Sequence, residues 1–192
     1  MPILGLLASA ISGNLFAPSG AYDSIATTTV STATATVTFS SIPATYTHLQ
    51  IRFLSQSNRT SSDSGDYLVV RFNSDTGSNY YYGHQLKGDG ATASAFANGS
   101  GTSILIERIG NYETNANAFT GGVTDILDYS NTNKYKTTRS LLGYSTNTAY
   151  GQVNLASGLW MSSAAISNIT ISMANAQHTQ YSQFALYGIK GA

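Results

Sequence analysis

The stretch 47-THLQIRFLSQS-57 decides the fold class of this chain. Within it, Leu49, Ile51 and Phe53 occupy every second position, so they share one face of an extended strand. The polar residues between them fall on the opposite face. An alternation of apolar and polar residues with a period of two is typical of an antiparallel sheet with one buried and one solvated face. We therefore expect a β-strand here, in a protein built from such strands.

The same alternation recurs along the chain, for example at Val37 and Phe39 and again at Ile169, Ile171 and Met173. Short runs of this kind are separated by clusters of Gly, Asn, Asp and Ser, which favour turns. The runs with strand composition are residues 33–42, 47–57, 66–73, 78–86, 103–110, 121–130, 134–144, 152–161, 166–174 and 182–190.

The segments between the runs favour turns and loops. YSNTNKYK (129–136) predicts a hairpin with residues 131–134 as its loop, and Asp128 is expected to pair with Lys134 or Lys136 across it. Residues 72–80 and 86–94 are expected to be turn-rich connectors of the same kind. The low-complexity stretches 55–67 and 88–103 are expected to be exposed loops.

About ten strands without intervening helices predict an all-β fold. We expect an antiparallel two-sheet sandwich, jelly-roll-like, with an N-terminal extended arm. In domain terms, we expect residues 1–20 to form the arm and residues 21–192 to form a single β-sandwich domain.

The opening segment MPILGLLASAISGNLFAPSG (1–20) contains no charged side chain. It lacks the positive n-region of a secretory signal, and its apolar run is shorter than the roughly 20 residues that cross a bilayer. We expect it to be an assembly arm that packs against another subunit, and the alternative is a first strand or helical turn within its own core. The expected assembly contacts are Ile3, Leu4, Leu6, Leu7, Ile11, Leu15 and Phe16.

Composition narrows the function classes. Only 9% of the residues are charged, with nine Lys or Arg against nine Asp or Glu, whereas ordinary soluble domains have about 25%. A neutral chain gains little from releasing phosphate counterions, so we expect no nucleic-acid partner. Low net charge favours association over remaining a free monomer. The chain has no cysteine, which excludes thiol chemistry and disulfides.

No catalytic or metal motif stands out. There is no G-x-S-x-G elbow, and the histidines His48, His84 and His178 lie far apart and are expected to be solvated. Asp125 and Glu107 lie in strand-like runs, but nothing in the sequence indicates that they face each other, as a glycosidase requires. We therefore expect a non-enzymatic protein without cofactor or metal.

The turn NSDTGSN (73–79) has oxygen-bearing residues at alternating positions, a pattern that Ca²⁺ loops share. A Ca²⁺ loop also needs a further acidic ligand, which is missing here. An Asx-rich hairpin turn has the same residue pattern and does not need that ligand. We therefore interpret this segment as a turn.

Aromatic residues offer a recognition surface. Tyr80, Tyr81, Tyr82 and Tyr150 are candidates for an exposed patch, because exposed tyrosines are typical of protein interfaces and sugar-binding surfaces. The alternative is that some of these rings belong to the sandwich core, with their hydroxyls at its rim.

Several segments resemble small all-β virion structural proteins of tailed bacteriophages. The likeness lies in LGLLASAISGNL, YDSIATTTV, SSIPATYTHLQIRF, RFNSDTGSNYYYGH, DILDYSNTNKYKT and FALYGIKG, which together span most of the chain. The resemblance implies a β-sandwich carried on the virion, either cementing the capsid or forming part of a tail or fibre. It implies no catalytic residues.

The leading hypothesis is a capsid cement or decoration protein that stabilises the shell through subunit contacts on the capsid exterior. Its expected partners are the major capsid protein or other virion proteins and further copies of itself, with a trimer favoured, and we expect neither nucleic acid nor a membrane. The alternative hypothesis is a tail or fibre component that recognises a host-surface glycan or receptor.

Overall fold

The computed structural model describes residues 21–60, 65–110, 116–145 and 151–191, which form β-strands and no helix. Accordingly, these residues contain no helix long and apolar enough to span a membrane. The strands are β1 (Tyr22–Thr29), β2 (Thr36–Phe39), β3 (His48–Ser55), β4 (Asp66–Phe72), β5 (Tyr80–Gly88), β6 (Ala93–Gly101), β7 (Ile104–Ile109), β8 (Thr120–Leu127), β9 (Lys136–Ser145), β10 (Gly151–Trp160), β11 (Ile169–Met173) and β12 (Gln183–Ile189).

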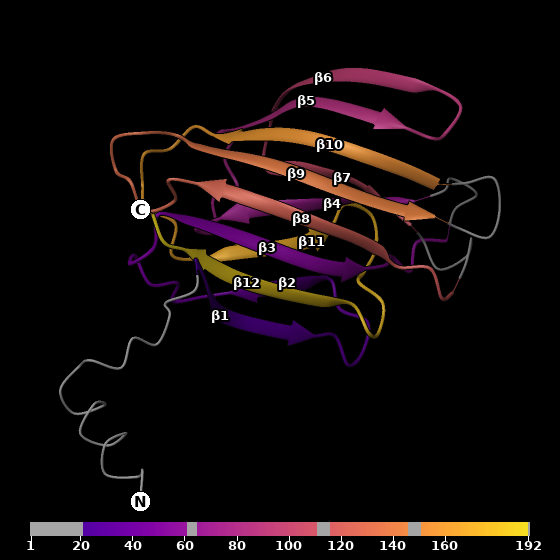
Figure 1. Cartoon of the computed structure of the whole chain (residues 1–192), viewed down its shortest axis with the longest axis horizontal. Coiled ribbons are helices and arrows are strands. Elements are labelled where there is room, and N and C mark those ends of the chain that lie inside the picture. The colour runs from indigo at the N-terminus through magenta and orange to yellow at the C-terminus, as the bar shows by residue number, and fades with distance from the viewer. Residues whose placement is uncertain (1–20, 61–64, 111–115, 146–150, 192) are drawn as a thin grey trace, which may run out of the picture.

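The strands form two antiparallel sheets that pack face to face (Figure 1). The large sheet has eight strands in the order β1-β12-β3-β8-β9-β10-β5-β6, and the small sheet has four in the order β2-β11-β4-β7. Figure 1 looks onto the large sheet, with the small sheet behind it. The large sheet is wider, and its edge strand β6 extends beyond the small sheet. The predicted two-sheet sandwich is confirmed.

The order of connections is that of a jelly roll. The chain runs from β2 in the small sheet to β3 in the large one, back to β4, on to the hairpin β5–β6, and back to β7. It then forms the meander β8–β9–β10 in the large sheet before returning to β11 and ending in β12. With the meander counted as one unit, the two sheets interleave as in a jelly roll, and β1 and β12 extend the large sheet.

The core lies between the two sheets and is built by the alternating residues. Leu49, Ile51 and Phe53 on β3 are at most 5% exposed. From the small sheet, Val37 and Ile171 reach the same hydrophobic cluster. Burying an aliphatic side chain of this size contributes about 1.5–3 kcal/mol. The period of two therefore predicted correctly which residues of these strands form the core.

All ten predicted runs contain a strand, but two further strands were not expected. Residues 22–29 form β1, and the stretch 88–103, expected to be an exposed loop, contains β6. That expectation was wrong because the Ala, Ser, Gly and Asn residues of β6 have low β-propensity, and the strand forms by pairing along the edge of β5. A four-residue turn, 89–92, joins the two strands, and the Asp89 carboxylate accepts hydrogen bonds from the Ala91 and Thr92 amides.

Candidate functional site

The outer face of the large sheet, which points away from the small sheet, carries a group of exposed aliphatic side chains. They are between 49% and 62% exposed, although side chains of this type are usually buried. We refer to them as the apolar outer face, which comprises Leu54, Leu86, Leu141, Val153 and Leu155.

Strand register makes these residues neighbours. Leu155 on β10 lies opposite Leu86 on β5 and also opposite Leu141 on β9. Leu141 in turn lies opposite Val123 on β8. Directly opposed residues have Cβ atoms about 4.5–5.5 Å apart, so the side chains form one continuous row across four strands.

A second row runs parallel to the first and is flattened by glycine. Val153 lies opposite Gly143, Gly143 opposite Gly121, and Gly121 opposite Leu54. The two glycines place no side chain between Val153 and Leu54. The surface is therefore apolar and low in relief, which suits close contact with a flat partner.

Parts of two strands of the large sheet, residues 153–155 of β10 and residues 85–86 of β5, carry apolar residues outward and polar residues inward. On β10, Asn154 is fully buried between the exposed Val153 and Leu155. On β5, Gln85 is 5% exposed beside the exposed Leu86. Among the described residues, both polar atoms of the Asn154 amide and Nε2 of Gln85 have no hydrogen-bond partner. A solvated sheet face has the opposite pattern, because burying unpaired amides is unfavourable.

A chain of polar side chains borders the apolar outer face. The Arg139 Nε donates to the Asp125 Oδ2 at 2.8 Å, and the Gln50 Nε2 donates to the Asp125 Oδ1 at 2.7 Å. The Arg52 Nε donates to the Gln50 Oε1 at 2.7 Å. Both oxygens of the Asp125 carboxylate therefore accept hydrogen bonds. The resulting chain of hydrogen bonds links side chains of the three adjacent strands β3, β8 and β9.

The guanidinium of Arg52 also lies over two aromatic rings. Its central carbon is 5.2 Å from the centre of the Tyr22 ring and 4.8 Å from that of Tyr187. These cation–π contacts connect β3 with β1 and β12 and extend the polar border to the edge of the sheet. An apolar centre with a hydrogen-bonded polar rim is the typical anatomy of a protein interface.

The tyrosines that we expected to form one recognition surface lie in different environments. Tyr80 is fully buried, its hydroxyl bonds to the backbone of Phe72, and burial raises its pKa. Tyr81 is 38% exposed. Tyr82 is half-buried, and its ring lies against Gly101. The expectation was wrong for Tyr80, because consecutive strand residues point to opposite faces. Tyr150 lies outside the described residues.

The expected assembly arm, residues 1–20, also lies outside the described residues. Its candidate contacts stay predictions; they are Ile3, Leu4, Leu6, Leu7, Ile11, Leu15 and Phe16.

One histidine corrects the expectation that all three are solvated. His178 is fully buried; its Nδ1 lies 3.1 Å from the Ser55 Oγ and its Nε2 lies 3.4 Å from the Ile171 carbonyl oxygen. Because a carbonyl can only accept, Nε2 carries the proton and the Ser55 hydroxyl donates to Nδ1. Burial lowers the pKa of His178 to about 4. This neutral, inaccessible imidazole is a structural group.

The remaining acidic candidates do not combine into a catalytic pair. Asp125 lies on β8 of the large sheet and is paired with Arg139, whereas Glu107 lies on β7 of the small sheet. Glu107 is 5% exposed, and burial raises the pKa of its carboxyl group. The described residues contain no group of three His, Cys, Asp or Glu side chains placed to hold a metal ion.

Two sequence predictions about turns are confirmed. The Asp75 Oδ1 accepts the Gly77 amide at 2.8 Å, as in an Asx turn, and its Oδ2 accepts the Trp160 indole N–H at 2.8 Å. These donors lower the pKa of Asp75. In the β8–β9 hairpin, Lys134 pairs with Asp128 at 2.7 Å.

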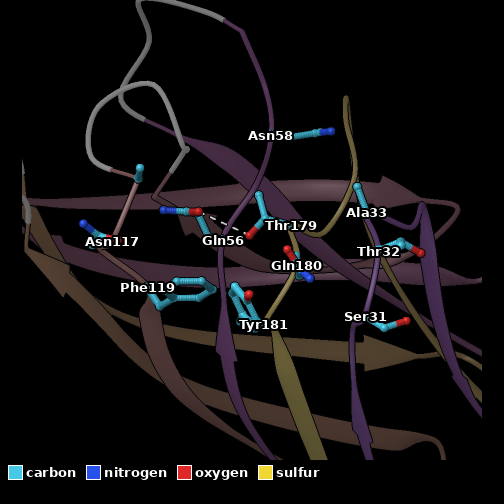
Figure 2. A pocket seen from close by; sticks show the side chains of 11 residues that line it. Ser31, Thr32, Ala33, Gln56, Asn58, Asn117, Phe119, Thr179, Gln180 and Tyr181 are labelled. Atoms are coloured by element: carbon cyan, nitrogen blue, oxygen red, sulfur yellow. Dashed lines mark hydrogen bonds between the residues drawn. The ribbon is translucent and has the colours of Figure 1, made fainter.

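A pocket of about 650 Å³ opens where connections between strands meet (Figure 2). Its lining comes from the β1–β2 connection (31–33), the β3–β4 connection (56 and 58), the β7–β8 connection (116, 117 and 119) and the β11–β12 connection (179–181). Sequence analysis did not identify this pocket, because the four segments are far apart along the chain.

Gln56 lines the pocket and forms hydrogen bonds to two of the other connections. Its side-chain amide donates to the Ala118 carbonyl at 2.9 Å and accepts the Thr179 hydroxyl at 3.2 Å. Its backbone carbonyl accepts the Thr179 amide at 2.9 Å. One buried glutamine thus holds three of the four connections together.

No protein-family model matches the chain, and no curated protein matches its sequence.

Proposed function

We propose that this chain is a non-enzymatic structural subunit of a large assembly that docks through the apolar outer face of its eight-stranded sheet. The particular role we propose is that of a capsid cement protein on a phage virion, with the major capsid protein or other virion proteins as partners. The virion assignment rests on the sequence resemblance, and the docking face rests on the structure.

The outward orientation of the apolar residues on β5 and β10 carries the proposal. On β10, turning Val153 and Leu155 outward leaves the Asn154 amide in the interior, and on β5, turning Leu86 outward leaves the Gln85 amide there. Each unpaired buried amide costs about 1–3 kcal/mol. A partner that covers the outer face recovers apolar burial of about 25 cal/mol per Å², which offsets that cost in the assembled state.

The charge distribution also supports docking on another protein. The apolar outer face contains no charged residue, and the neighbouring Arg139 and Asp125 neutralise each other. A partner therefore needs no complementary charge cluster, and contact does not desolvate an unpaired ion. The apolar N-terminal segment 1–20 would add a second contact to a neighbouring subunit.

A variant with two charged substitutions tests the proposal. Leu141→Arg combined with Leu155→Arg places two cations in the centre of the apolar outer face. The matched control is Thr36→Arg combined with Thr38→Arg, at exposed positions on β2 of the small sheet. Binding to virions that lack this chain is measured by co-sedimentation.

We expect the outer-face pair to weaken binding at least about tenfold, because buried unpaired charge is costly in an interface, and the control pair to bind like the unmodified chain. Unchanged binding by the outer-face pair would refute the docking face. A cryo-electron microscopy reconstruction of the native virion then locates the chain. A few copies at the tail, with the large sheet facing solvent, would refute the cement role.

A further inference from the structure

The pocket at the meeting point of the four connections is chemically unlike the apolar outer face. Two aromatic rings, Phe119 and Tyr181, contribute to its lining. The other lining side chains are amides, hydroxyls and alanine methyl groups, and no charged side chain lines it within the described part of the chain. In Figure 2 the rings lie toward one end, residues 31–33 lie toward the other, and Thr179 and Gln180 lie between them.

The Tyr181 ring is held outward by a constrained backbone. The side chain is 69% exposed, and its φ of 70° lies in the left-handed region that residues other than glycine rarely adopt. The Tyr181 amide donates to the Val30 carbonyl at 2.9 Å, and the Ser182 amide donates to that of Thr179 at 3.2 Å. Strain of this kind persists where surrounding contacts impose it, and it is concentrated at functional sites.

The walls are tied together before any ligand arrives. Thr34 and His178 exchange backbone hydrogen bonds of 3.1 and 2.8 Å, which join the β1–β2 connection to the β11–β12 connection. Asn58 donates its backbone amide to the Gln177 carbonyl at 3.0 Å, which adds the β3–β4 connection. A ligand that enters therefore loses little affinity to ordering these segments.

We propose that this pocket binds a neutral saccharide. A pyranose ring has an apolar C–H face that packs on an aromatic ring and hydroxyls at its edge that pair with amides and hydroxyls. Phe119 and Tyr181 supply the rings, and Gln180, Thr32 and Ser31 supply exposed polar groups. The volume of about 650 Å³ lies within the range of small-molecule sites, about 300–1,000 Å³. The absence of a charged lining side chain in the described ranges favours an uncharged ligand.

This site differs from the tyrosine surface that we expected from the sequence. The rings come from the β7–β8 and β11–β12 connections, whereas Tyr80 and Tyr81 lie on β5. The pocket also shares no lining residue with the apolar outer face, so the saccharide proposal does not rest on the proposed docking function.

The test is a titration of the full chain with maltotriose, cellotriose, chitotriose and mannotriose. Binding is measured by calorimetry and by ligand-observed NMR. A hexagalacturonate and a proline-rich peptide of similar length serve as charged and peptide comparisons. We expect at least one neutral trisaccharide to bind with a Kd below about 5 mM. The proposal is overturned if no neutral trisaccharide binds with a Kd below that limit. It is also overturned if either comparison ligand binds more tightly than the trisaccharides.

Variants connect binding to the pocket. Phe119→Ala and Tyr181→Gly should each weaken saccharide binding about tenfold or more, because each removes a stacking ring. Glycine at position 181 accepts the positive φ, so this variant keeps the fold without its ring. Tyr135→Ala, which removes another exposed ring, from the β8–β9 connection, should bind like the unmodified chain. Binding that survives both pocket variants, or is lost in Tyr135→Ala, overturns the assignment.

Discussion

Lys136 provides a stringent test of how the sandwich is held together. Its side chain is fully buried, and its ammonium donates hydrogen bonds to three backbone carbonyls, those of Asn131 at 2.6 Å, Lys134 at 2.7 Å and Ser163 at 3.2 Å. The first two carbonyls belong to the β8–β9 connection, and the third belongs to the β10–β11 connection. One cation therefore ties two loops together.

Replacing Lys136 with Met keeps most of the side-chain length and removes every donor. A hydrogen bond to a charged group contributes about 1.5–3 kcal/mol to stability. The total loss is smaller than three such contributions, because water reaches the partly exposed carbonyls and the cation no longer has to be desolvated. We expect the free energy of unfolding to fall by about 2–4 kcal/mol.

Lys134→Met is the matched control, because it makes the same chemical change two residues away. Lys134 forms its ion pair with Asp128 at the surface, where the two side chains are 61% and 31% exposed. Exposed pairs contribute at most about 1 kcal/mol. Urea unfolding, followed through the fluorescence of the single tryptophan, Trp160, measures both variants. Equal losses in the two variants would refute the argument that the contacts of the buried Lys136 ammonium with the three carbonyls stabilise the fold.

Two further predictions concern local features. Burial lowers the pKa of His178 to about 4 in the folded chain. As the pH falls below about 6.5, this histidine is therefore protonated in the unfolded chain before it is protonated in the folded one. The free energy of unfolding should be at its full value above about pH 6.5 and fall by roughly 3 kcal/mol as the pH drops toward 4. The free energy of unfolding, measured by urea titration across this pH range, should depend less steeply on pH in His178→Gln than in the unmodified chain. An unchanged pH dependence would contradict the assignment. Gly83 and Gly90 both have positive φ, but an added Cβ lies 2.3 Å from the Ser157 carbonyl oxygen at Gly83 and meets nothing within 4 Å at Gly90. Gly83→Ala should therefore cost about 2–4 kcal/mol and Gly90→Ala about 1–2 kcal/mol in unfolding experiments, and equal costs would count against the steric explanation.

Strand positions were the most predictable part of the fold. In 47-THLQIRFLSQS-57 the alternation is local, and both its strand and its buried face match the structure. The turn at Asp75 was predictable for the same reason, because an Asx carboxylate bonds to amides a few residues away. Strand β6 was not predictable, because its residues have little β-propensity and its pairing depends on the edge of β5.

The candidate sites were less accessible to sequence reasoning. His178 has no distinctive neighbours along the chain, and its burial results from pairing with Thr34 and Ser57, more than a hundred residues away. The pocket likewise depends on Phe119 and Tyr181 meeting at the junction of connections that the jelly-roll order brings together.

The sequence by itself determined that this protein is a neutral, cysteine-free β-sandwich, and it determined which side chains share a face of each strand. Only the tertiary structure decided where the apolar face of a strand points outward instead of inward. On β10 it turns Asn154 toward the small sheet and Val153 and Leu155 toward the outside. The physical reason is that alternation is a property of a single strand, whereas burial depends on the sheet that packs against it.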